Sequence, residues 1–189
     1  MADPDYIPEI PCDAQDDPCS SFGSEFSCNL SSQVCQVRVT FELVTLTDLA
    51  NEVPELETVG SYNFTTVRLD YIRMKVLENT FSVPTPPVDV FVAPETTVAL
   101  FVTGSDPPTL SPGVEAVGTV PSIPAGVSGH SEEVVLTAGG NAAITRFCRS
   151  PEIPFNIFVF SEVVVQGGDP LPQGRLMLQV DSAATVSLD

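Results

Sequence analysis

Residues 155–165 read FNIFVFSEVVV, a stretch that is apolar on both faces of an extended strand. A strand of this kind lies either in the middle of a sheet that is covered on both sides or at an interface. We expect central burial, because the same strand left exposed at a sheet edge would promote aggregation. The stretch therefore predicts a sheet with further strands on both sides of residues 155–165.

The chain after residue 36 supplies such strands. In residues 37–43 every second side chain is apolar, which is typical of a half-buried strand. This alternation slips at Leu43-Val44, where a β-bulge would re-aim the side chains that follow. Further strands, separated by turns rich in glycine and proline, are expected at residues 88–92, 97–102, 114–120, 133–137, 142–147, 154–165 and 175–180, with 185–188 as a terminal partner.

Residues 62–78 fit either a strand or a helix. As a strand they need a bulge at Tyr71-Ile72, whereas as a helix Val67, Tyr71 and Met74 share one face. We expect a long bulged strand, because the flanking segments favour strands and no long helix is predicted elsewhere. Residues 47–53 are expected to form one or two helical turns.

Many short strands joined by such turns indicate an all-β fold, an antiparallel β-sandwich of the Greek-key or jelly-roll kind. We expect two parts, an acidic tail with a disulfide-stapled segment at 1–36 and the sandwich at 37–189. Residues 77–84, LENTFSVP, resemble the strand-turn pattern of β-sandwich proteins of the late-embryogenesis type. This resemblance covers a small part of the chain and implies no function.

Four of the five cysteines, Cys12, Cys19, Cys28 and Cys35, follow the spacing C-x6-C-x8-C-x6-C. Structural zinc sites use closer cysteine pairs, and the redox motif C-x-x-C is absent from the sequence. The spacing therefore predicts two disulfides, which substitute for a core in this loop-rich segment. Three pairings are possible, and we favour Cys12–Cys28 with Cys19–Cys35 because interleaved bridges compact the segment most.

Disulfides imply an oxidising compartment, so we expect an exported protein of the cell surface or envelope. The first residues, MADP, lack the basic and apolar regions of a signal peptide, and we expect that an export signal has been removed. The acidic residues before Cys12 would then link the domain to a lipid anchor or to a partner. No apolar stretch is long enough to predict a membrane span.

The formal charge of −18, from 25 acidic and 7 basic residues, restricts the partners of the protein. Such a charge repels nucleic acids and anionic membranes but is compatible with calcium and with cationic partners. Asp13, Asp16 and Asp17 are the candidate calcium ligands, since they place hard oxygen donors on a stapled loop. Ordinary solvated acidic residues are the competing interpretation, which we favour.

Catalytic motifs are missing from the sequence. The single histidine, His130, lies in GVSGHSEE, which is not a nucleophile motif, and no metalloprotease or phosphate-binding motif is present. Cys148, expected to be a free thiol, has arginines on both sides that would favour a reactive thiolate. We favour the alternative, a small apolar residue that faces the core from a strand.

These features together predict a non-enzymatic, exported β-sandwich that acts as a structural or interaction module, with no cofactor. A calcium-dependent domain that binds carbohydrate or matrix is the first alternative. The second is a self-assembling filament subunit in which residues 1–11 add as a strand to the sheet edge of a neighbour. The identity of the partner and the oligomeric state are not predicted.

Overall fold

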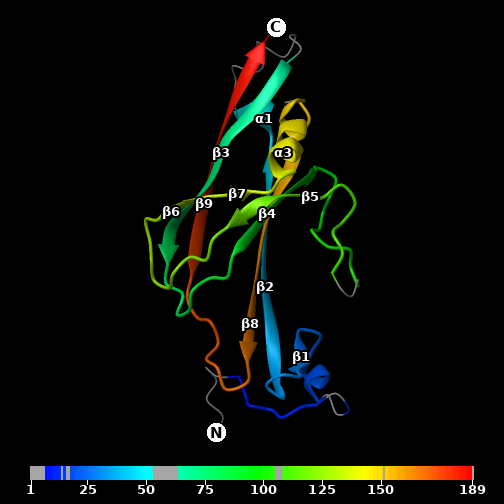
Figure 1. Cartoon of the computed structure of the whole chain (residues 1–189), viewed down its shortest axis with the longest axis vertical. Coiled ribbons are helices and arrows are strands. Elements are labelled where there is room, and N and C mark those ends of the chain that lie inside the picture. Colours follow the sequence, from blue (N-terminus) through cyan, green and yellow to red (C-terminus); the bar gives the residue numbers. More distant parts are fainter. Residues whose placement is uncertain are drawn as a thin grey trace.

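The computed structural model describes residues 7–13, 15, 18–52, 64–104, 108–150 and 152–188. It is mostly β, with two antiparallel sheets that pack as a sandwich (Figure 1), which confirms the predicted fold class. The six-stranded sheet has the order β1-β2-β8-β4-β5-β7, and the three-stranded sheet has the order β6-β3-β9.

The large sheet contains β1 (Phe26–Asn29), β2 (Val34–Thr47), β8 (Phe155–Gln166), β4 (Val88–Pro94), β5 (Glu115–Val120) and β7 (Val135–Leu136). The small sheet contains β6 (Ser131–Glu133), β3 (Phe64–Asn79) and β9 (Leu176–Leu188). The described helices are η1 (Cys19–Phe22), α1 (Leu49–Glu52) and α3 (Gly140–Cys148).

Strand β8 occupies the centre of the large sheet, as the apolar run at 155–165 predicts. It pairs with β2 on one side and with β4 on the other. Its side chains alternate between two buried clusters, because Val159 packs in the core between the sheets while Phe158 packs on the opposite face. Burial on both faces explains why this strand carries so few polar residues.

The main core lies between the sheets and α3. Ile72 and Met74 from β3 meet Val90 and Val92 from β4, and Ile144 from α3 completes the cluster. The second cluster, on the outer face of the large sheet, is closed by the loop that contains Leu100. All described pairings are antiparallel.

Several predicted elements are corrected by the structure. Residues 142–147 form part of helix α3 instead of a strand, because Ala143, Ile144 and Phe147 are spaced to face the core from one side of a helix. Residues 97–102 form no strand and contribute only an isolated bridge between Phe101 and Leu110. The separate strands expected at 175–180 and 185–188 are one continuous strand, β9.

The ambiguous segment at 62–78 is a strand, β3, over Phe64–Asn79, while residues 62 and 63 lie outside the described residues. A shift in its register with β9 falls between Leu69 and Tyr71, just before the predicted bulge. The bulge predicted at Leu43-Val44 is wrong, because β2 pairs with β8 without interruption from Gln36 to Thr47. The helical turn expected at 47–53 is present as α1.

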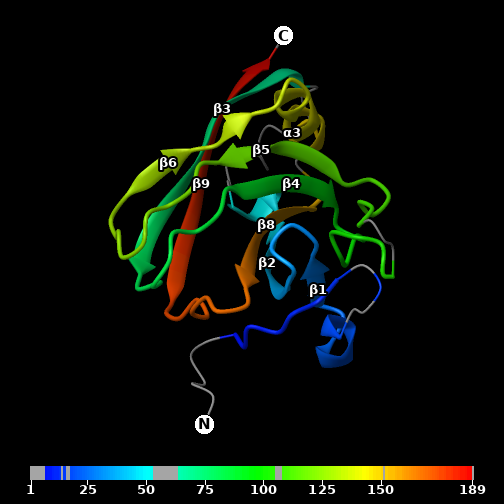
Figure 2. The ribbon, with the colours of Figure 1, turned by 60° about the horizontal axis from the view of Figure 1, so that its bottom comes forward.

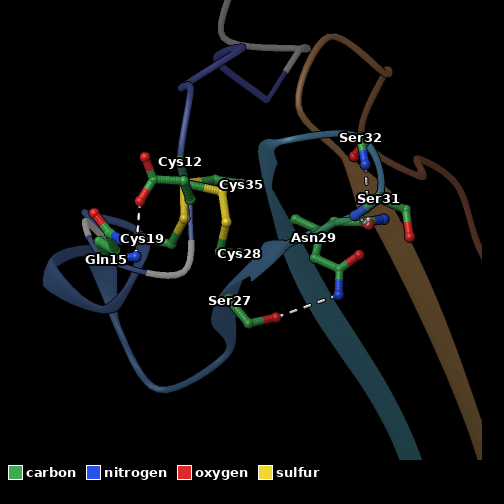
Figure 3. The surroundings of a disulfide bond; sticks show 11 residues. Cys12, Gln15, Cys19, Ser27, Cys28, Asn29, Ser31, Ser32 and Cys35 are labelled. Atoms are coloured by element: carbon green, nitrogen blue, oxygen red, sulfur yellow. Dashed lines mark hydrogen bonds between the residues drawn. A yellow bond between two sulfur atoms is a disulfide. The ribbon is translucent and has the colours of Figure 1, made fainter.

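Two disulfides join Cys12 to Cys28 and Cys19 to Cys35, which confirms the interleaved pairing (Figure 3). Their sulfurs form a small cluster with Ile10 and Phe26, separate from the core between the sheets. Strand β1 lies at the edge of the large sheet and pairs with the first residues of β2, which runs without a break through residue 36. The division of the chain at residue 36 stays a prediction.

We expect the disulfides to order only the N-terminal segment. Each closes a loop with a sequence separation of 16 and contributes about 3 kcal/mol to local order. Replacing Cys12, Cys19, Cys28 and Cys35 by Ser should therefore shift the main thermal transition by less than about 3 °C. The same variant should be cut rapidly by subtilisin within residues 12–35.

Cys148→Ser is the control, since it removes a thiol without removing a bridge. Loss of the cooperative transition in the four-cysteine variant alone would contradict this expectation and would make the segment part of the main folding unit.

Candidate binding cleft between the sheets

The two sheets leave an apolar cleft of about 420 Å³ on one side of the sandwich. Strand β9 lines the cleft on one side and the β2–β8 pair lines it on the other; Figure 2 shows where these strands lie. The connection between β3 and β4 forms a third wall. The cleft is lined by Thr40, Phe41, Glu42, Leu43, Phe81, Val83, Pro84, Thr85, Pro86, Val88, Val159, Ser161, Val163, Pro172, Leu176 and Leu178.

Two of the few polar side chains of this lining, Ser161 and Thr85, are engaged within the fold. The Ser161 hydroxyl donates to the carbonyl of Pro87 at 3.2 Å. The Thr85 hydroxyl oxygen accepts the amide of Ile123 at 3.0 Å. The Glu42 carboxylate points to the outer face of the sheet, where it accepts the amide of Leu100 at 3.2 Å. Because these two hydroxyls already have partners, the cleft offers its occupant a largely apolar surface.

One wall of the cleft is anchored by Asn79, which is buried. Its amide nitrogen donates to the carbonyl of Pro124 at 2.9 Å, and its side-chain oxygen accepts the backbone amide of Phe81 at 3.0 Å. The Phe81 ring then lies 5.8 Å from the ring of Phe41, centroid to centroid. This pair joins the β3–β4 connection to β2 at the cleft.

Beside the cleft, β2 has a free edge over residues 39–47. Strand β1 pairs only with Val34–Val37, and no other described strand pairs with β2 on that side. The free edge exposes large apolar side chains, with Phe41 39%, Leu43 58%, Val44 54% and Leu46 50% exposed. Long, unprotected apolar edges are normally avoided because they recruit further strands.

The proposed calcium ligands are only partly described. A carboxylate oxygen of Asp13 accepts the backbone amide of Gln15 at 2.7 Å, while Asp16 and Asp17 lie outside the described residues. Within the described part of the chain, one group of metal-ligating residue types comes together, namely Cys12, Cys19 and Cys28. All three are in disulfides, so they offer no thiolate to a metal.

His130 lies before β6, where its imidazole contacts the carboxylate of Glu132. Its carbonyl accepts the amide of Val76 at 2.8 Å. The neighbouring hydroxyl of Ser128 accepts the amide of Asn79 at 2.9 Å, which gives it a structural role. These contacts place His130 at the edge of the small sheet, among residues that hold the loop.

Cys148 ends helix α3 and packs against the core between the sheets. It faces this core from a helix and not from the expected strand. Burial raises the pKa of the Cys148 thiol to about 11. The thiol is therefore protonated at neutral pH, in spite of the two neighbouring arginines.

Sequence reasoning missed the cleft. Its walls come from segments far apart in the chain, namely residues 40–43, 81–88, 159–163 and 172–178. The one sequence feature that pointed to it was the break in the apolar–polar alternation at Leu43-Val44, which places apolar side chains on both faces of β2. We interpreted it as a bulge, but in an unbulged strand it marks an edge that is apolar on both faces.

Comparison of the chain with protein-family models, with curated proteins and with solved structures found no match. Among the described helices, none has the length and apolar character needed to cross a membrane. The cleft and the free edge of β2 are therefore the features of the structure that bear on its function.

The pKa of Cys148 predicts how the thiol reacts with pH. Because the raised pKa favours the neutral thiol, the thiolate fraction at pH 7 should be about 100-fold below that of an unperturbed cysteine with a pKa near 9. Alkylation of the folded protein by iodoacetamide should accelerate about tenfold per pH unit up to pH 9.5. A plateau below pH 9 would contradict the assignment, and the urea-unfolded protein serves as the control.

Proposed function

We propose that this protein is an exported, non-enzymatic module of the cell surface or envelope that binds another protein through the cleft between its sheets. The observation that carries this proposal is an open, largely apolar cleft in which the Thr85 and Ser161 hydroxyls are engaged within the fold. Its volume of about 420 Å³ is within the range of natural binding sites. Exposed apolar surface that persists beside such a cleft is typical of an interaction site.

The compartment is supported by the two disulfides. Bridges of this kind persist in oxidising surroundings and are rare in the cytosol. We include attachment to the envelope through a lipid anchor in the proposal, with the N-terminal residues as the link. The protonated state of Cys148 fits a role that does not use the thiol.

The two alternative functions have less support from the described residues. For calcium binding, Asp13 is engaged with its own backbone turn. For self-assembly through residues 1–11, the described part of this segment is already occupied. The amide of Ile7 donates to the carbonyl of Asp169 at 3.2 Å, and its side chain is buried with Val37 and Val165.

A neutral fluorescent dye tests whether the cleft accepts apolar groups. Nile red, which carries no charge for the acidic protein to repel, should bind the wild-type protein with an increase in emission. Leu43→Asp places a charge at the mouth of the cleft and should weaken dye binding at least fivefold. The matched control is Val98→Asp, at a side chain that is 93% exposed and outside the cleft lining.

Equal dye binding by Leu43→Asp and the wild-type protein would contradict the proposal, as would no binding to the wild-type protein. Thermal unfolding of both variants checks that each remains folded.

A further inference from the structure

We propose that the occupant of the cleft is an extended, basic segment of a partner protein, which adds to the free edge of β2 as an antiparallel strand. This inference rests on the proposed function and names the partner of the same site. In this arrangement the added strand inserts alternate apolar side chains into the cleft and places lysine or arginine on the opposite face.

The backbone of β2 presents hydrogen-bonding groups along its free edge. The amide of Arg38 donates outward to the carbonyl of Glu25 at 2.9 Å, whereas the carbonyl of Cys35 accepts from Gly167, beyond the end of β8, at 2.8 Å. Because β2 runs without a bulge, even-numbered residues point their backbone groups outward. Thr40, Glu42, Val44 and Leu46 therefore offer an unpaired ladder within the described structure, part of an edge of roughly 30 Å.

The added strand is expected to be antiparallel to β2. Strand β1 already occupies the start of the same edge in this orientation. Residues that lie directly opposite each other share a face, so the two faces of the added strand can be assigned from β2.

The inner face of this edge is the cleft. Phe41 and Leu43 lie opposite Ser161 and Val159 of β8, and all four line the cavity. Side chains of the added strand that lie opposite Phe41 and Leu43 therefore enter an apolar space. Residues such as valine, leucine or phenylalanine fit these positions.

On the outer face of the edge, carboxylates gather around Glu42, while Val44 and Leu46 farther along are apolar. Across the sheet, Glu42 of β2 pairs with Phe160 of β8, and Phe160 pairs with Asp89 of β4. Glu162 of β8, which pairs with Thr40, lies on the same face. Arg38 is the basic residue of β2 on this face, with its Nε 3.2 Å from a carboxylate oxygen of Glu162. A residue opposite Glu42 therefore meets a local excess of carboxylates, which favours a cation.

The charge of the whole chain favours the same partner over a second copy. The formal charge of −18 attracts a basic segment and accelerates its association, whereas two copies repel each other. A homodimer formed edge to edge would also place Glu42 of one copy near the carboxylates around Glu42 of the other.

The test uses a capped, fluorescent peptide of about nine residues in which valine and lysine alternate, with binding followed by anisotropy at low salt. The peptide should bind the wild-type protein in the micromolar range, displace Nile red, and lose at least tenfold in affinity when its lysines are replaced by glutamate. Failure to bind, with dye binding intact, would overturn this inference while the proposed function stands.

Backbone methylation tests strand addition directly. In an antiparallel ladder the lysine opposite Glu42 exchanges both backbone hydrogen bonds with it, whereas the valine amides point away from β2. N-methylation of the lysine amides should therefore weaken peptide binding at least tenfold, whereas N-methylation of the valine amides should retain most of the affinity. Equal loss with the two peptides would overturn the assigned register.

A pair of protein variants tests the outer face. Glu42→Lys should weaken binding of the lysine peptide at least threefold more than Glu133→Lys, which changes the net charge equally but lies on β6 of the other sheet. Equal effects of the two variants would mean that net charge alone explains the attraction of the peptide, which would overturn the role of Glu42. Light scattering on the wild-type protein tests whether the edge is instead occupied by a second copy of the chain. A stable dimer that does not bind the peptide would assign the edge to that second copy.

Discussion

The uninterrupted pairing of β2 with β8 is the constraint on which the rest of this structure depends. It joins Gln36–Thr47 to Phe155–Gln166 in one register, so every inward side chain of one strand lies beside an inward side chain of the other. The pairing places β8 in the centre of the large sheet and extends β2 well beyond the reach of β1. The apolar cleft and the free edge both follow from this extension, because nothing in the described chain continues the sheet past residue 38.

The disulfide-bonded segment limits the same edge from one end. Cys35 of β2 is bonded to Cys19, and β1 pairs with β2 only over Val34–Val37. The disulfide-bonded segment therefore covers the start of β2 and leaves the rest of this edge uncovered in the described structure. The N-terminal residues add to this end, since Ile7 packs against Val37 and Val165. The fold thus buries one half of β2 under its own chain and leaves the other half available to a partner.

The sequence was sufficient for features that depend on local patterns. The apolar run at 155–165 predicted a central strand, and the cysteine spacing predicted two disulfides but left their pairing open. The strand expected at 142–147, one of several short segments separated by turns rich in glycine and proline, is a helix, since Ala143, Ile144 and Phe147 have helical spacing. The cleft was not predictable, since it requires the relative placement of β2, β8, β9 and the β3–β4 connection.

Amide hydrogen exchange along β2, measured residue by residue by NMR, tests the free edge most directly. We expect an alternation, with rapid exchange at Thr40, Glu42, Val44 and Leu46, and slow exchange at Phe41, Leu43 and Thr45, whose amides point toward β8. Addition of a strand-forming peptide should then slow the even-numbered amides selectively. Uniform protection of residues 40–46 in the free protein would contradict the account, because it would mean that the edge is already covered.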